Sequence, residues 1–189
     1  LNSGNSVGTL TNHGIIAGAY HSGILNTIGT IATIINASDG VINGGSSGIF
    51  NYSGRIGTIS NSGTISGYNG IYNFNGSIDA INNSGKIIAH HGLYNDSGAS
   101  IGTITNSGTI SSSGSGVGIN IQAGSIGTIL NSGLINGGNI GVYNSAVGTI
   151  GSINNSGIIR SGVGGFSALT NYGTLGTITN SGLISGQGG

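Results

Sequence analysis

The side chains that could do acid–base chemistry in this sequence are few and scattered. The carboxylates are Asp39, Asp79 and Asp96, and the 189 residues contain neither Glu nor Cys. Cleavage of a glycosidic bond needs two carboxyl groups roughly 5–10 Å apart. The three aspartates fall at three different points of the sequence repeat described below, so no two share a position on adjacent copies. We therefore expect no catalytic residues and no enzymatic activity.

The histidines are the other candidates for chemistry, namely His13, His21, His90 and His91. Neighbouring residues of a strand point to opposite faces, so His90 and His91 are not expected to share a metal ion unless they lie in a turn. No recurring Asp of the kind that binds calcium in nonapeptide repeats accompanies them. We predict no metal site and no cofactor.

Charge and composition exclude several classes of protein and partner. Arg55, Lys86 and Arg160 balance the three aspartates, which gives a net charge of zero. Binding to nucleic acid or to an anionic membrane surface needs clusters of Lys and Arg, so neither partner is expected. No apolar run approaches the ~20 residues of a membrane-spanning helix, so this segment is not expected to insert into a membrane. The 42 glycines come without a single proline, which excludes collagen.

The chain is one repeat copied eight times. The phrase Ile-Gly-Thr-Ile-x-Asn-Ser-Gly-x-Ile occurs at 56–65, 101–110 and 126–135, and at 175–184 with Leu in first place. Looser copies begin at residues 7, 31, 78 and 150, so successive copies start 22 to 25 residues apart. A period near 24 without a helical pattern favours a β-solenoid, since a propeller blade needs about 40 residues or more.

Aligned copies share columns of identical residues. Counting the first residue of each copy as position zero, position +3 is aliphatic, position +7 is Gly in seven copies and position +9 is Ile in seven. Position +5 is Asn in all eight copies, at Asn12, Asn36, Asn61, Asn83, Asn106, Asn131, Asn155 and Asn180. A second phrase between the copies contributes an aliphatic column that begins at Ile24, and a column two residues later that is Asn except at Ile121.

These columns predict three short strands per repeat, separated by Gly, Ser and Asn turns. The aliphatic residues at +3, at +9 and in the third segment must face the core, and the +5 Asn then also points inward. An inward Asn must be hydrogen-bonded, either to the Asn of the next coil in an amide ladder or to its local backbone. The Gly columns are expected at corners that need positive φ or no side chain.

Two outward columns could carry a function. Phe50, Tyr72, Tyr94 and Tyr143 occupy one column, and aromatic faces can stack on sugars or on a protein partner. The competing interpretation is a cross-strand aromatic ladder that only stabilises the sheet. Positions +2 and +4 form outward Thr pairs similar to those of ice-binding solenoids, but half of the copies lack the pair.

We therefore predict an all-β fold: a single right-handed parallel β-helix of about eight three-strand coils that spans residues 1–189. Eight coils at ~4.8 Å each make a rod about 40 Å long. Neither end carries an atypical polar cap, so we expect either a segment of a longer rod or a subunit that stacks end to end.

The repeated phrase at 56–65 and 101–110 resembles the passenger regions of bacterial autotransporter adhesins and the β-helices of filamentous-haemagglutinin-type exoproteins. That resemblance covers essentially the whole chain. It implies a secreted or surface-displayed rod of a Gram-negative bacterium. The expected function is a non-enzymatic stalk, spacer or fibre subunit, whose partners are flanking coils or other copies. The alternatives are a module that binds glycans or proteins through the aromatic column and, in third place, an ice-binding solenoid.

Overall fold

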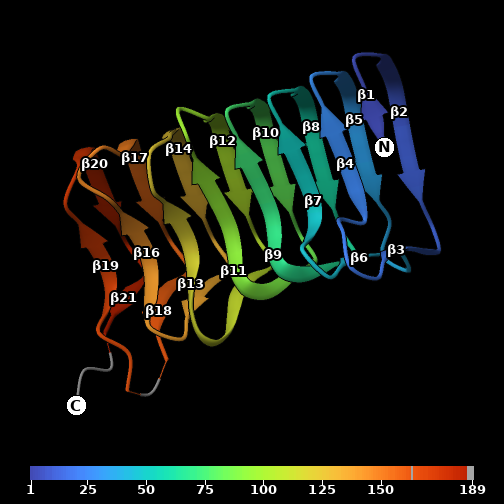
Figure 1. Ribbon diagram of the computed structural model, residues 1–189. Helices are drawn as coiled ribbons and strands as arrows, with labels where there is room; N and C mark the ends of the chain where they lie inside the picture. Colours follow the sequence, from blue (N-terminus) through green and yellow to red (C-terminus); the bar gives the residue numbers. More distant parts are fainter. Residues whose placement is uncertain (163, 187–189) are drawn as a thin grey trace.

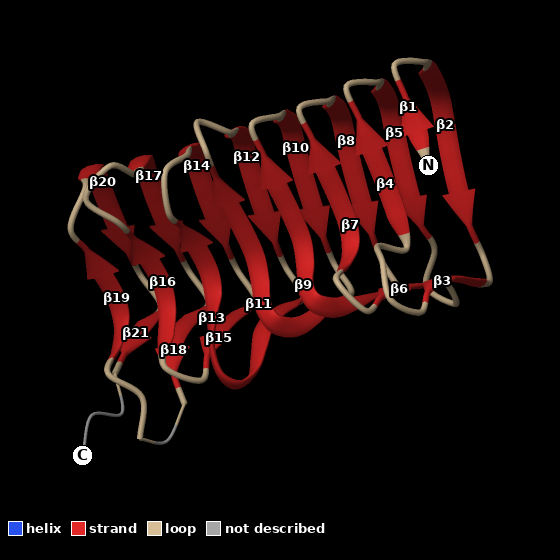
Figure 2. Cartoon of the chain, in the orientation of Figure 1, coloured by secondary structure: helices blue, strands red, loops and turns tan. Residues whose placement is uncertain are grey.

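The computed structural model describes residues 1–162 and 164–186. Within these residues the chain forms strands β1 to β21 and no helix, and every pair of neighbouring strands is parallel. Figure 1 shows the strands wound into a single coil that advances from the N-terminus to the C-terminus, and Figure 2 shows turns alone joining them. The all-β solenoid predicted from the repeats is confirmed.

The first of two sheets is built from one seven-residue strand per repeat. Its order along the coil axis is β2 (Ser6–Asn12), β5 (Thr30–Asn36), β8 (Arg55–Asn61), β10 (Ser77–Asn83), β12 (Ser100–Asn106), β14 (Ser125–Asn131), β17 (Thr149–Asn155) and β20 (Thr174–Asn180). Pairing joins equal positions of successive repeats, for example Ile81 with Ile104 and Asn83 with Asn106. Each sequence column is therefore a column in space.

The second sheet collects the remaining strands of every coil. They are β1 (Asn2–Ser3), β3 (Ile15–Gly18), β4 (Ile24–Thr27), β6 (Val41–Gly44), β7 (Ser47–Tyr52), β9 (Thr64–Phe74), β11 (Lys86–Asp96), β13 (Thr109–Ile121), β15 (Leu134–Gly137), β16 (Ile140–Asn144), β18 (Ile158–Ser161), β19 (Ser167–Asn171) and β21 (Leu183–Ser185). In Figure 1 its nearer strands, such as β9 and β11, run upward and the farther strands of the first sheet run downward, which describes a right-handed coil.

The three strands predicted for each repeat are separate in the outer coils and partly fused in the centre. In the outer coils a short turn, such as 45–46, lies between the second and third segments. In the centre, β9, β11 and β13 each run through both segments as one strand of 11 to 13 residues. The repeats that contain β9 and β11 are the two shortest, at 22 and 23 residues, so they have no residues to spare for a separating turn.

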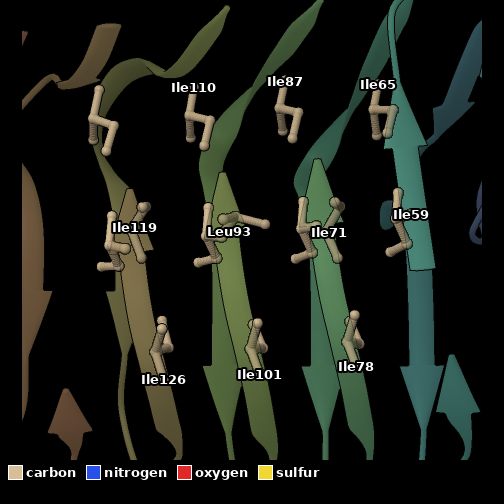
Figure 3. Packing of buried hydrophobic residues seen from close by; sticks show 14 of the residues in the cluster. Ile59, Ile65, Ile71, Ile78, Ile87, Leu93, Ile101, Ile110, Ile119 and Ile126 are labelled. Atoms are coloured by element: carbon tan, nitrogen blue, oxygen red, sulfur yellow. The ribbon is translucent and has the colours of Figure 1, made fainter. Parts of the chain in front are cut away.

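The core is a set of aliphatic columns that run along the axis. Figure 3 shows three of these rows, which include Ile65, Ile71 and Ile78 with their counterparts in the next coils. In the inner coils the columns at +3 and +9 and in the third segment are buried as predicted, with Ile104 and Ile110 at 0 % exposure, whereas Ile178 in the last described coil is 45 % exposed. Burial of one such side chain stabilises a fold by ~1.5–3 kcal/mol.

A fourth buried column, at position zero, was not predicted as part of the core. Ile56 is fully buried, as is Ile59 three residues later. Strict alternation would place these two side chains on opposite faces, so the strand departs from alternation between them. The pairing shows the same departure, because it runs from Ile78 opposite Ile101 directly to Ala80 opposite Thr103.

Glycine lies at the corners as predicted, and both the +7 corner and the corner after the third segment use it where the chain approaches closely, as at Gly54, where a Cβ would lie 2.3 Å from Nδ2 of Asn26. At the +7 corner a Cβ on Gly85 would lie 2.3 Å from the carbonyl oxygen of Gly63, so close approach of the coils excludes a side chain there. The corner after the third segment also has one position with positive φ, which is occupied by Gly4, Ile28, Ser53, Asn75 and Ser97 in five successive coils. At this one position of the corner, a left-handed backbone is therefore adopted mostly by residues other than glycine.

Candidate functional site

An amide ladder runs through the molecule at position +5. Asn12 donates from Nδ2 to Oδ1 of Asn36, and the same bond recurs in every following coil up to Asn155 and Asn180, at 2.7–2.9 Å. The seven donors are buried, whereas Asn180 in the last described coil is exposed. The inward orientation predicted for this column is thus present in the structure.

The amides also bond to backbone, so the two interpretations of the Asn column hold together. Nδ2 of Asn36 lies 3.1 Å from the carbonyl oxygen of Gly40 in its own turn and 3.1 Å from that of Thr64 in the next coil. One buried amide thereby ties a strand end to its own corner and to the adjacent coil. The ladder thus satisfies hydrogen-bonding groups at the corner with uncharged side chains.

A second amide ladder lies at the C-terminal end of the third segment of each coil. Asn2, Asn26, Asn51, Asn73 and Asn95 are joined by the same amide bond at 2.8–3.0 Å. The ladder stops at Ile121, which has no amide, and resumes with a bond of 2.7 Å from Asn144 to Asn171. This interruption leaves Oδ1 of Asn144 buried without a hydrogen-bond partner among the residues that the structure describes.

Eight rings gather on the outward side of β7, β9 and β11, in a surface that we call the aromatic face. Its members are Phe50, Tyr52, Tyr68, Tyr72, Phe74, His90, His91 and Tyr94. The ring centroids of Phe50 and Tyr72 are 4.8 Å apart with planes at 4°, and those of Tyr72 and Tyr94 are 5.0 Å apart at 61°. The structure therefore brings three of the four predicted aromatic residues into contact.

The aromatic face is wider than the single column predicted from the sequence. A second row begins two residues further along the strands, where Tyr52 and Phe74 stack at 5.5 Å and 6°. Each also contacts the first row edge to face, Tyr52 against Phe50 at 5.9 Å and Phe74 against Tyr72 at 5.9 Å. An i, i+2 spacing on one strand could have indicated this row, because such residues share a face.

Tyr143, the fourth predicted aromatic residue, lies apart from the aromatic face. In the strand register Asn120 stands between Tyr94 and Tyr143, so one coil without a ring separates them. Tyr143 instead contacts Tyr172, with centroids 6.0 Å apart at 68°. The aromatic column is thus two separate groups.

His90 and His91 depart from the orientation expected of strand neighbours. Their ring centroids are 4.6 Å apart, and both rings contact Tyr68. The pairing of β11 with β13 shifts between Ala89 and His91, and this irregularity breaks the alternation of faces. The expectation that the two histidines point apart was wrong for that reason.

His91 is half-buried and accepts a hydrogen bond at Nδ1 from the backbone N–H of Val117, at 3.3 Å. Burial, together with the nearby His90, lowers the pKa of His91 from 6.5 to about 4. The imidazole is therefore neutral at pH 7. Among the described residues no three His, Cys, Asp or Glu side chains lie close enough to hold a metal ion.

Two phenols of the aromatic face have raised pKa values. Burial is the largest cause for both Tyr72 and Tyr94, followed by the carboxylate of Asp96, and the pKa of Tyr72 reaches about 12. Asp96 is the last residue of β11, opposite Phe74, and accepts a 2.7 Å hydrogen bond from the N–H of Ser97. The phenols are consequently hydrogen-bond donors at neutral pH, with a carboxylate beside them.

The other two aspartates lie elsewhere and are paired. Asp79 forms an ion pair with Arg55 on the neighbouring coil, and both side chains are about half exposed. Asp39 lies 3.2 Å from Nδ1 of His13, in an exposed pair. Exposed pairs of this kind contribute little to stability.

Two concavities lie along the first sheet and the turns that follow it. One has a volume of about 240 Å³ and is lined partly by Leu130, Asn154 and Thr179. The other, of about 420 Å³, is lined partly by Ser62, Ser84 and Lys86. No ring of the aromatic face lines either concavity.

The outward Thr pairs predicted at +2 and +4 do lie on the outer side of the first sheet, but they are interrupted. Thr9 and Thr11 are exposed, whereas Ile35 and Leu130, each 36 % exposed, replace Thr at +4 in other coils. The outer surface of this sheet is therefore not a regular Thr array. No helix of the described part of the chain is suited to spanning a membrane.

No protein-family model, no curated protein sequence and no solved structure matches this chain. The two sheets of parallel strands, stacked in register through about eight coils, define it as a β-solenoid repeat protein.

Proposed function

We propose that this chain is a non-enzymatic rod of a bacterial surface protein, either the stalk of an adhesin or a subunit of a filament. The observation that carries the proposal is the ladder from Asn12 to Asn180, which is unbroken through all eight coils. A molecule with a continuous row of buried amide hydrogen bonds along its axis is suited to bearing load along that axis.

The mechanical role follows from how one coil is held to the next. Each coil is joined to its neighbour by backbone hydrogen bonds of both sheets, by aliphatic contacts and by one or two amide bonds. These contacts must break together for two coils to separate. The separation of the three aspartates, two of them in exposed pairs, supports a role without catalysis.

An extracellular, surface-displayed location belongs to the same proposal, and the resemblance of the repeats to autotransporter and haemagglutinin-type β-helices supports it. The test uses an antibody raised against this chain. On intact source cells we expect the antigen to be accessible to antibody and to added protease, and labelled straight rods should be visible by electron microscopy. An antigen that stays protected until the cells are lysed would overturn the proposal.

The intact mass of the native antigen separates the two forms of the rod. A mass far above 18.3 kDa would identify these coils as part of a long stalk. A mass close to that value would favour a subunit that stacks end to end, with coils of one copy continuing those of another.

A further inference from the structure

The solenoid does not need the aromatic face in order to form. The column of Phe50, Tyr72 and Tyr94 continues without rings in the coils on either side. The preceding coil has Leu25 and the following coil has Asn120 at the same position, and both pair in the same register. The aliphatic core beneath the rings is complete, since Ile49, Ile71 and Leu93 are 0–1 % exposed. The rings are thus an addition to the outside of three coils.

The aromatic face is concentrated and solvent-accessible. It holds eight of the fourteen Phe, Tyr and His rings of the chain. Tyr52 and Tyr68 are 41 % and 56 % exposed, and the other six are half-buried. Clustered aromatic residues on the surface of a soluble protein commonly mark an interaction site.

The charges around the aromatic face restrict the chemistry of a partner. None of its members is Lys or Arg, and the three cations of the chain lie elsewhere. Arg55 pairs with Asp79 on the other sheet, Lys86 lines a concavity and Arg160 donates to Asn136. The carboxylate of Asp96 lies near the face, where it raises the pKa of Tyr72, and it would repel a polyanion. A nucleic acid or a sulfated glycan is therefore a poor fit.

The shape of the aromatic face distinguishes a sugar from a protein partner. Protein interfaces bind tightly where an anchor side chain fills a pocket, and the rings here pack against each other, away from both concavities. A sugar needs no pocket: its C–H groups can pack on exposed aromatic rings, which Tyr52 and Tyr68 supply, and its hydroxyls need hydrogen-bonding groups nearby. We propose that the aromatic face binds a neutral polysaccharide.

The edge of the aromatic face supplies the polar contacts. The Asp96 carboxylate accepts hydrogen bonds from sugar hydroxyls, and the protonated phenols of Tyr72 and Tyr94 donate to them. In the turns that follow the three strands, Nδ2 of Asn75 donates to Oγ of Ser53 at 3.2 Å, so an amide and a hydroxyl are also exposed there. Binding would use rings for contact area and this edge for orientation.

The test is isothermal titration calorimetry of the purified chain with three neutral probes, cellohexaose, chitohexaose and maltohexaose, and with heparin as a polyanion. We expect one neutral probe to bind with a Kd of about 10 µM to 1 mM, and heparin not to bind. The double variant Tyr72→Ala/Tyr94→Ala should weaken binding at least about tenfold. The matched control, Tyr143→Ala/Tyr172→Ala, removes two rings in mutual contact outside the aromatic face and should bind as the wild type does.

Circular dichroism and thermal melts show whether each variant folds. If the double variant does not, Tyr68→Ala tests the same face at its most exposed ring and should weaken binding about threefold or more. Lack of binding to all three neutral probes, equal binding of heparin, or equal losses in the test and control variants would overturn the proposal. None of these results bears on the rod, because the proposed mechanical role does not use the rings.

Discussion

Asn144 lies one coil beyond Ile121 in the same column, and its buried amide oxygen therefore has no donor. In the intact part of that ladder the Oδ1 of Asn51 accepts from Asn26 at 2.8 Å. Its Nδ2 reaches Asn73, Gly54 and Ser77. Among the described residues, the side chain of Asn144 bonds only to Asn171 and to the carbonyl oxygen of Thr174. Two residues of one type in one column thus have different hydrogen-bonding environments.

This difference predicts that truncating the two side chains lowers the free energy of unfolding by unequal amounts. Asn51→Ala should lower the free energy of unfolding by about 2–4 kcal/mol, because it removes several buried hydrogen bonds at about 1 kcal/mol each and leaves partners unpaired. Asn144→Ala should cost at least about 1 kcal/mol less, since it also removes an unsatisfied buried acceptor. Urea unfolding followed by circular dichroism measures both. Equal costs would show that the interruption at Ile121 has no energetic consequence.

The inward and outward positions of one strand predict a second contrast. Ile104 is fully buried in the +3 column, whereas Thr103 faces outward. Ile104→Ala should cost about 2–5 kcal/mol through lost burial and a residual cavity, and Thr103→Ser should change stability by less than about 0.5 kcal/mol. Thermal melts of the two variants measure this difference in stability. Similar melting temperatures would contradict the assignment of the inward face.

The left-handed corner predicts a stabilising substitution. Ile28 has φ of 62° and a side chain that is 69 % exposed, so it strains the backbone without contributing to the core. Ile28→Gly should raise the free energy of unfolding by about 0.5–1 kcal/mol, because relief of ~1–2 kcal/mol exceeds the entropic cost of glycine. Ile28→Ala keeps Cβ and should bring little gain. A lower melting temperature for the glycine variant would refute this account of the corner.

His91 predicts a dependence of stability on pH. Its pKa is about 4 in the folded chain and 6.5 when unperturbed, so the unfolded chain takes up the proton first as the pH falls. The contribution of neutral His91 to the free energy of unfolding is therefore complete above pH 6.5 and is lost progressively as the pH falls towards 4. Protonation of Nδ1 would also break the hydrogen bond from Val117. Melting temperatures between pH 7.5 and 4 provide the measurement.

The matched variants for this prediction are His91→Gln and His21→Gln, since His21 is exposed. The first should have a shallower decline of melting temperature between pH 6.5 and 4 than the wild type, and the second should follow the wild type. Parallel curves for the wild type and His91→Gln would exclude His91 as the source of the pH dependence.

Much of the solenoid could be predicted because its repeats pair position by position. An all-Asn column such as Asn36, Asn61 and Asn83 can be satisfied by its own copies or by local backbone, and the structure shows both kinds of bond. The buried column at position zero was missed because Ile56 and Ile59 are three residues apart, which alternation assigns to opposite faces. A local irregularity in the strand allows both to be buried.

The candidate site was less predictable, since it depends on departures from the repeat. The sequence by itself determined the period, the parallel pairing, the inward Asn column and most of the core, because each of these properties recurs in every copy. Only the tertiary structure decided that His90 and His91 lie on one side of β11, that two rows of rings merge into one face, and that Tyr143 stands apart. The physical reason is that a shift in strand register or a single Asn120 between two rings changes which side chains meet, while the periodic pattern remains the same.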